Sequence, residues 1–283
     1  MKILVLGATG MAGHTIALYF KEQGYEVHAF SRKPFPYCKW IEGDAFDTEK
    51  LKHVVTSGHY NTVINCIGLL NQYAESAPEK AIYINGYLPH QIVAWLKDTP
   101  TKFIQMSTDC VFAGNDGPYD EQSLPNGLSY YDRTKALGEV NDDKNLTFRN
   151  SIIGPDINKN GIGLFHWFIQ QNGIINGFTK AIWTGVTTLT LAKAMDKAIQ
   201  TNLTGLYNLV NNDSISKYNL LCLFNKHFRN DEIKIEKSGK LVLDKTLICK
   251  RNDFDFVVPS YEQMVIDMKE WVNNHKELYP LYI

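Results

Sequence analysis

The sequence is poor in cysteine, and its cysteines show no pattern. The five residues are odd in number and widely spread, without a CxxC pair. This spacing gives no readable disulfide framework. No two histidines lie four residues apart, and none lies beside a cysteine at ligand spacing, so no structural metal site is predicted. We expect reduced thiols, as in intracellular proteins.

An excess of charge and long hydrophobic runs are also absent. The chain carries 29 basic and 30 acidic side chains, whereas proteins that bind nucleic acid or anionic membranes usually concentrate Lys and Arg. No apolar stretch approaches the roughly 18 residues of a membrane span, and the apolar run before Gly7 is too short for a signal peptide. The sequence therefore predicts a soluble, cytoplasmic globular protein without nucleic-acid or membrane partners.

What the sequence does contain is a regular alternation of strand-like and helix-like segments. Helical patterns, including a long one at 79–96, separate buried-strand patterns at 2–6, 25–30, 61–66, 102–106 and 146–149. This alternation predicts an α/β fold with a doubly wound parallel sheet of the Rossmann type. We expect residues 1–150 to form a dinucleotide-binding domain, 186–210 to return to its sheet, and 151–283 to form mainly a smaller C-terminal substrate-binding lobe.

A glycine-rich loop joins the first predicted strand to the first predicted helix. It reads GATGMAG, starting at residue 7. Such glycines permit a tight turn and bring the backbone close to a pyrophosphate, which the free N–H groups of the helix N-terminus can bind. A tight turn without a ligand is the alternative, but the strand-turn-helix context favours a dinucleotide. The predicted cofactor contacts are Gly7, Thr9, Gly10, Met11 and Gly13.

Further candidate cofactor contacts follow other strands. An acidic residue at the end of the second strand would favour NAD, but this position reads Ser31-Arg32-Lys33. The Arg32 guanidinium can pair with a 2′-phosphate, which favours NADPH and leaves NADH open. A solvated basic loop is the alternative. The predicted contacts in these segments are Ser31, Arg32, Asp44, Ala45, Cys66, Ile67 and Gly68.

The segment after the predicted strand at 102–106 contains candidate catalytic residues. Tyr131 and Lys135 are four residues apart and so share one face of a helix. An ammonium beside a phenol favours the phenolate, which lets a tyrosine act as an acid near neutral pH. The spacing alone is weak evidence, because tyrosine and lysine are frequent in this chain. It gains weight from its place 23 residues after Thr108, in the expected order of strand, loop and helix.

Three stretches together resemble one enzyme family. STDCVF at 107–112, YDRTK at 131–135 and the pair Gly138-Glu139 look like the motifs of the dTDP-4-dehydrorhamnose reductases. The GxxGxxG spacing resembles the wider short-chain dehydrogenase/reductase superfamily. The resemblance implies an NADPH-dependent oxidoreductase that reduces a nucleotide-linked 4-keto-6-deoxysugar, in deoxysugar and surface polysaccharide biosynthesis.

The resemblance also implies roles for single residues. Thr108 would bind the substrate carbonyl, Tyr131 would donate the proton, and Lys135 would tune Tyr131 and hold the nicotinamide ribose. Tyr131 and Lys135 are therefore cofactor contacts as well as catalytic residues. The candidate substrate contacts are Thr108, Asp109, Cys110 and Tyr131. Trp183 is a further candidate because its ring could stack on a sugar or base, with a place in the core as the alternative.

Departures from the family pattern leave alternatives open. Cys110 stands where the family commonly has Tyr, and Asp132 where it often has Gly. Asn85 resembles a helix asparagine that supports the site, with helix packing as the alternative. A related epimerase or dehydratase is a second interpretation, although dehydratases typically carry Asp-Glu after the threonine. A third is a non-catalytic regulatory subunit like that of methionine adenosyltransferase. The sugar, and whether the protein is a homodimer, stay open.

Overall fold

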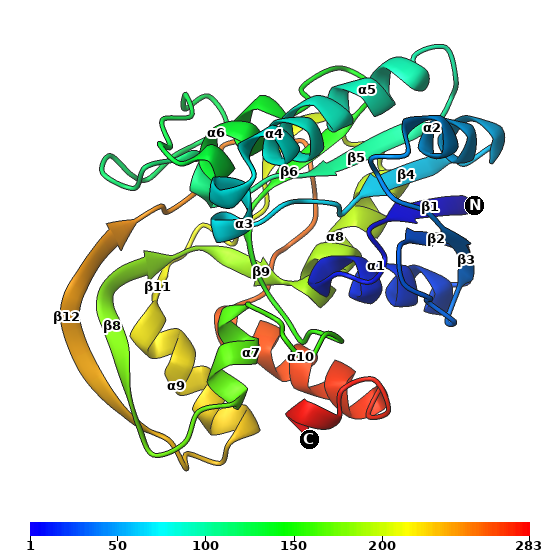
Figure 1. The fold of residues 1–283 in the computed structure, drawn as a ribbon. Helices are drawn as coiled ribbons and strands as arrows, with labels where there is room; N and C mark the ends of the chain where they lie inside the picture. Colours follow the sequence, from blue (N-terminus) through cyan, green and yellow to red (C-terminus); the bar gives the residue numbers. More distant parts are fainter.

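The central element of the molecule is a seven-stranded parallel sheet. Its strands are β1 (Lys2–Leu6), β2 (Glu26–Ser31), β3 (Lys39–Glu42), β4 (Thr62–Asn65), β5 (Lys102–Met106), β6 (Leu146–Arg149) and β10 (Gly205–Asn208). The computed structural model describes residues 1–283, and the strand order is β10-β6-β5-β4-β1-β2-β3 (Figure 1). The winding direction reverses between β1 and β4, which confirms the predicted doubly wound sheet of the Rossmann type.

Helices cover both faces of this sheet, because strands of continuous apolar composition must be buried on both sides. In β1, Ile3 and Val5 belong to one hydrophobic core, and Leu4 and Leu6 belong to another. The helices on the first face are α1 (Met11–Glu22) and α8 (Thr188–Gln200) (Figure 1). Those on the second are α2 (Thr48–Ser57), α3 (Asn71–Ser76), α4 (Pro78–Ala81), α5 (Leu88–Trp95) and α6 (Tyr130–Leu137).

The helix predicted at 79–96 is interrupted in the structure. A π-helical turn, η1 (Ile82–Tyr87), separates α4 from α5. Pro89 has no N–H to donate to the helical ladder. The Asn85 carbonyl oxygen lies instead against α6, where a Cβ on Gly138 would be only 1.8 Å away from it. π-helical turns of this kind often occur at functional sites, and this one carries a residue that the sequence singles out.

The last part of the chain forms a smaller lobe beside the sheet (Figure 1). Its three-stranded sheet has the order β11-β8-β12. The remaining elements are η2 (Asp109–Val111), β7 (Ser151–Ile153), α7 (Leu164–Ile169), β8 (Ile174–Trp183), β9 (Gly185–Thr187), β11 (Ile215–Ser216), α9 (Lys217–Phe228), β12 (Lys234–Asp244), α10 (Tyr261–Asn274) and η3 (Pro280–Tyr282). Within this part, β10 is a strand of the central sheet, and α8 packs on one face of that sheet. The division into domains at residue 150 stays a prediction. None of the helices is both long and apolar enough to span a membrane.

Candidate active site

The glycine-rich loop joins β1 to α1 at the carboxyl end of the sheet. Gly7 has φ +78°, a left-handed conformation that disfavours any side chain. A Cβ on Gly13 would lie 2.2 Å from the Gly7 carbonyl oxygen, so only glycine lets α1 approach the loop this closely. Gly10 begins α1 without a side-chain cap, which leaves first-turn N–H groups for an anion. The loop therefore fits a bound diphosphate.

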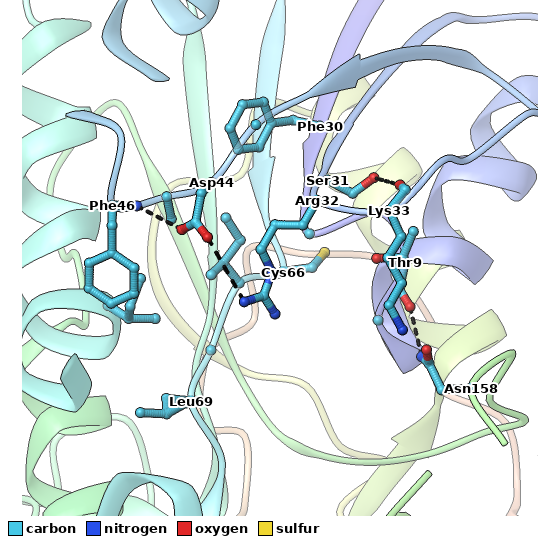
Figure 2. Close-up of a pocket in the computed structure, with 17 residues that line it drawn as sticks. Thr9, Phe30, Ser31, Arg32, Lys33, Asp44, Phe46, Cys66, Leu69 and Asn158 are labelled. Carbon is cyan, nitrogen blue, oxygen red and sulfur yellow. Dashed lines mark hydrogen bonds and ion pairs between the residues drawn. The ribbon is translucent and has the colours of Figure 1, made fainter. Parts of the chain in front are cut away.

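A cavity of about 360 Å³ opens at this loop (Figure 2). Residues from the ends of several strands meet in it. Those that the sequence predicts as cofactor contacts are Gly7, Thr9, Gly10, Ser31, Arg32, Asp44, Ala45, Cys66, Ile67 and Gly68. Met11 and Gly13 do not line the cavity, and neither do Tyr131 and Lys135. The structure thus brings ten predicted residues together, and the contact of each with a cofactor stays a prediction.

Charged side chains lie at the rim of this cavity (Figure 2). The Arg32 guanidinium is 3.9 Å from Asp44 Oδ2, and the Arg32 side chain is 78% exposed, so this ion pair is weak. Asp44 Oδ1 accepts a hydrogen bond from the Phe46 N–H (3.0 Å). Ser31 Oγ donates to the Lys33 carbonyl oxygen (2.7 Å) and so orders the basic turn. An anion entering here would meet Arg32 without first breaking a buried ion pair.

Seven further lining residues are not among the predicted contacts. They are Phe30, Lys33, Gly43, Phe46, Leu69, Ile84 and Asn158. Most are direct neighbours of predicted residues, so extending each motif by one position would include them. Asn158 has no such signal. Its Nδ2 donates to the Thr9 carbonyl oxygen (2.9 Å) across 149 positions of sequence, a distance over which no local pattern is informative.

Thr108 lies just beyond β5, at the same edge of the sheet. Its Oγ1 accepts a hydrogen bond from the Cys110 N–H (3.2 Å) and thereby caps the 3₁₀ turn η2. The same hydroxyl donates to Asp109 Oδ1 (3.1 Å). Burial raises the pKa of the Asp109 carboxyl, and the hydrogen bond from Thr108 partly opposes this rise. Thr108 therefore both ends a strand and presents a hydroxyl at the edge where ligands bind.

Tyr131 and Lys135 lie one turn apart on α6. The helix begins with a capping box, in which Ser129 Oγ accepts from the Asp132 N–H (3.0 Å) and Asp132 Oδ2 accepts from the Ser129 N–H (3.2 Å). Asp132, a departure from the family pattern, thus stabilises the start of the helix. Lys135 Nζ donates to the Met106 carbonyl oxygen (2.5 Å), which ties α6 to the end of β5.

Burial shifts the pKa values of both residues on this helix. It raises the pKa of the Tyr131 phenol, Cys110 adds to the rise, and hydrogen bonding with the Thr108 hydroxyl opposes it. Burial lowers the pKa of the Lys135 ammonium to about 8, against the attraction of the Glu139 carboxylate. The phenol is therefore protonated at neutral pH, with a titrating cation on the same helix face. Lys135 is not among the groups that shift the pKa of Tyr131, so the tuning of the phenol by this lysine stays a prediction.

The Glu139 carboxylate is held in place by a buried network. It accepts hydrogen bonds from Arg149 Nε (2.8 Å) and Nη2 (2.6 Å) and from Ser107 Oγ (2.6 Å). The Arg149 side chain is almost fully buried, and a buried two-point ion pair of this kind has little freedom to rearrange. The network fixes the ends of β5 and β6 relative to α6, and so fixes the frame that carries Thr108.

Asn85 also acts as a structural link. Its Oδ1 accepts from the Leu69 N–H (2.8 Å), and its Nδ2 donates to the Leu69 carbonyl oxygen (2.9 Å). Nδ2 also lies 3.2 Å from Thr134 Oγ1 on α6. The π-helical turn thus joins the loop after β4, which lines the cavity, to the helix that carries Tyr131.

One predicted substrate contact lies elsewhere. Trp183, at the end of β8, is buried beside Tyr261, with ring centroids 5.7 Å apart. Its Nε1 donates to Ser151 Oγ (2.8 Å). It does not line the cavity, and its role toward a substrate stays a prediction. No group of three or more His, Cys, Asp or Glu side chains that could hold a metal ion is present.

Relatives of known name match the chain to different extents, and two of them illustrate the range. Over 143 residues it is 34% identical to the probable low-salt glycan biosynthesis reductase Agl14 of Haloferax volcanii, covering 49% of this chain and 48% of that protein. Over 247 residues it is 24% identical to the methionine adenosyltransferase 2 subunit beta of Xenopus tropicalis, covering 78% of this chain and 70% of that subunit. The alignment with the first relative thus spans about half of each chain.

Solved structures share the fold over nearly the whole chain. The dTDP-4-dehydrorhamnose reductase of Bacillus anthracis, in complex with NADP, aligns with a TM-score of 0.79 at 20% identity, over 94% of this chain and 98% of that chain. A hypothetical dTDP-4-dehydrorhamnose reductase from Sulfolobus tokodaii gives 0.78 at 22% identity, over 93% and 98%. The profile of one family, described as RmlD substrate binding domain, matches residues 1–241. This match covers most of the sequence and confirms the predicted resemblance, so the chain belongs to the RmlD substrate binding domain family.

Proposed function

We propose that the protein is an NADPH-dependent reductase of a nucleotide-linked 4-keto-6-deoxysugar, acting in deoxysugar and surface polysaccharide biosynthesis. The observation that carries this proposal is the hydrogen bonding of Tyr131 with Thr108 at the carboxyl edge of the sheet, where the glycine-rich cavity also opens. Lys135, one turn along the same helix, is bonded to the end of β5. A relative from Streptomyces niveus, 28% identical over 138 residues, is named a dTDP-4-keto-6-deoxy-D-glucose reductase. The same chemistry in this chain would explain its similarity to this relative and to the dTDP-4-dehydrorhamnose reductase structures.

The cavity would hold the cofactor through the backbone and the basic rim. The N–H groups of the glycine-rich loop would bind the pyrophosphate, as the open first turn of α1 allows. Arg32, paired only weakly with Asp44, would turn to a 2′-phosphate, which favours NADPH over NADH. The loop from Cys66 to Gly68 would lie along the riboses. When bound, the nicotinamide supplies the hydride for the substrate carbonyl carbon.

The residues around Thr108 would complete the reduction. Tyr131 would donate its phenol proton to the substrate carbonyl oxygen, and the Thr108 hydroxyl would turn from Asp109 to hydrogen-bond the same oxygen. The Lys135 ammonium would favour the phenolate that remains. Asp109 and Cys110 would lie on the substrate side, and Asp109 is buried there.

Replacing Tyr131 tests this assignment. With a panel of nucleotide-linked keto-deoxysugars, the protein should oxidise NADPH, followed by its absorbance, and NADH run in parallel measures the cofactor preference. Tyr131→Phe should lower kcat by about 100-fold or more, because a general acid contributes at least that factor, while the NADPH dissociation constant stays unchanged. Tyr130→Phe is the matched control, since Tyr130 is half-exposed on the same helix. Wild-type turnover by Tyr131→Phe would overturn the mechanism.

A regulatory subunit is the second candidate. The observation in its favour is the alignment of 78% of this chain with a methionine adenosyltransferase 2 subunit beta. Such a protein would bind the cofactor and a partner enzyme without turning over any sugar. NADPH binding with no oxidation across the whole panel, together with a stable complex with a methionine adenosyltransferase, would favour it.

A nucleotide-sugar epimerase would instead convert a sugar without net NADPH consumption. The homodimer and the cytoplasmic location stay predictions.

A further inference from the structure

A loop from the C-terminal part of the chain crosses the glycine-rich loop. We call residues 154–163 the crossing loop. Its Asn158 lines the cavity, and Asn158 Nδ2 donates to the Thr9 carbonyl oxygen (2.9 Å), as Figure 2 shows. Its last residue, Gly163, also lies against Met11, because a Cβ there would be 3.0 Å from the Met11 sulfur. The crossing loop thus contacts the segment that would bind a pyrophosphate at two points.

The contact with Thr9 orients one peptide group of the glycine-rich loop. On one side of this peptide the Thr9 carbonyl is held by Asn158. On the other side the Gly10 N–H donates to the Gly7 carbonyl oxygen (3.0 Å). With both polar groups of one peptide fixed, the neighbouring N–H groups are held in a single orientation. A preorganised anion site gains affinity because less ordering remains to be done on binding.

Asn158 itself is oriented by Asp156. Asp156 Oδ1 accepts hydrogen bonds from both the Asn158 N–H (2.8 Å) and Asn158 Nδ2 (2.9 Å). The amide side chain is therefore held between the Asp156 carboxylate and the Thr9 carbonyl. Any shift of Asp156 would move the Asn158 amide away from the glycine-rich loop.

Asp156 is in turn held by Tyr282 of η3. The Asp156 N–H donates to the Tyr282 hydroxyl (2.8 Å), which also lies 2.6 Å from His166 Nδ1. The other ring nitrogen, His166 Nε2, lies 3.2 Å from the Lys159 carbonyl oxygen, so the histidine fixes the crossing loop at a second position. His166 and Tyr282 are buried. These groups form one hydrogen-bonded chain from η3 to the cavity.

We propose that residues 156–159, fixed by the Tyr282 hydroxyl, position the glycine-rich loop for the cofactor, so that dinucleotide affinity depends on the docking of η3. This inference rests on the proposed NADPH site. Asp156 and Tyr282 are positioning residues, because they act through the loop backbone, whereas Asn158 both holds that backbone and lines the cavity. The coupling is reciprocal: whatever factor η3 docking adds to cofactor affinity, bound cofactor must add to η3 docking.

Tyr282→Phe tests the proposal, because it removes the hydroxyl and keeps the ring that stacks on Phe165 (centroids 5.2 Å apart). The NADPH dissociation constant, measured by nucleotide fluorescence, should rise about 3- to 10-fold, which is the loss of one net hydrogen bond. Tyr261→Phe is the matched control. It also removes a buried hydroxyl of the lobe, one that donates to the Asp213 carbonyl oxygen (2.6 Å), and should leave the dissociation constant unchanged.

A second variant and a second readout keep the proposal testable if Tyr282→Phe folds poorly. Asn158→Ala removes a partly exposed side chain and should weaken NADPH binding by a similar factor. In wild-type protein, NADPH should slow hydrogen exchange both in the peptide that contains Asp156 and in the peptide that contains η3. Equal affinity of both variants and the wild type, or no slowing of exchange in η3, would overturn the positioning role while NADPH oxidation stands. Wild-type protein without NADPH affinity would overturn the cofactor proposal as well.

Discussion

At the scale of single residues, the proposed mechanism depends on the charge of the buried Lys135 ammonium. Lys135 Nζ donates to the Met106 backbone carbonyl and forms no ion pair with a carboxylate. Glu139, the anion that most favours its charge, is occupied by Arg149 and Ser107. The buried Lys135 ammonium therefore loses its proton at about pH 8, whereas an exposed lysine stays charged to about pH 10. In the proposed mechanism, Lys135 would no longer favour the Tyr131 phenolate once this proton leaves.

A pH profile should report this titration. The proposed mechanism needs Lys135 protonated, and burial lowers the pKa of this ammonium to about 8. The value of kcat/KM should therefore be full below that pH and fall as pH rises through it. The measurement is kcat/KM from pH 6 to 10 at saturating NADPH, with circular dichroism at each pH as the control for folding. A profile that stays flat to the alkaline end would contradict the assigned role of Lys135.

The residues of the cavity were predictable to the extent that local chemistry places them. Gly7, Gly10 and Arg32 can be assigned because a tight turn, a helix N-terminus and a strand end are properties of short segments. Asn158 could not be, since only the tertiary fold brings it to Thr9. Trp183 was proposed because its ring could stack on a sugar or base, and the structure instead buries it beside Tyr261.

At the scale of elements, the crossing of the π-helical turn and α6 sets the position of the helix that carries Tyr131 and Lys135. Gly138 lies at the end of α6, directly against the Asn85 carbonyl oxygen. The Asn85 side-chain amide in the same turn forms hydrogen bonds with the Leu69 backbone and the Thr134 hydroxyl. Close packing at Gly138 therefore fixes both the cavity wall and the helix of Tyr131.

Adding a methyl group at this crossing should separate the two elements. Gly138→Ala should lower the free energy of unfolding by about 1–3 kcal/mol, the usual cost of overpacking, because the new Cβ would lie 1.8 Å from a backbone oxygen. Urea denaturation measures the loss. Gly239→Ala is the control, since its nearest contact would be 3.9 Å away on the flexible Lys180 side chain. Equal stability of the two variants would contradict the packing argument.

The elements themselves were predicted unevenly, for a physical reason. β1 and β5 are buried over most of their length, and each carries an apolar run in the sequence, ILVL in β1 and FI in β5. β8 and β12 form a small sheet with many exposed positions, and their Lys, Asn, Gly and Thr residues suggest loops. Their pairing joins positions about 60 residues apart, such as Ile174 with Lys234, which no local pattern reveals.

At the scale of the whole molecule, segments distant in sequence meet behind the glycine-rich loop. His14 on α1 is fully buried, with Nδ1 2.9 Å from the Gly10 carbonyl oxygen and Nε2 2.7 Å from the Tyr279 hydroxyl. Trp271 on α10 donates to the same hydroxyl (3.1 Å). The first helix and α10 are therefore held together by a buried imidazole, which must stay neutral to remain there.

Acid should weaken this junction. Burial lowers the pKa of His14 from 6.5 to about 4, against the raising effects of the Gly10 carbonyl and Asp156. As pH falls below 6.5, His14 becomes protonated in the unfolded chain but stays neutral in the folded chain. Stability that is present above 6.5 is therefore lost progressively down to pH 4. By linkage this site should cost about 2 kcal/mol of unfolding free energy between pH 7 and pH 5.

Comparing variants isolates the His14 contribution from other titrating groups. Urea denaturation at pH 7 and pH 5 should show that His14→Gln loses less stability on acidification than the wild type, by about the same 2 kcal/mol. His53→Gln, on the exposed face of α2, should follow the wild type. If His14→Gln instead loses as much stability as the wild type, the imidazole is not the group that couples acid to unfolding, and the junction of α1 with α10 must tolerate a charge.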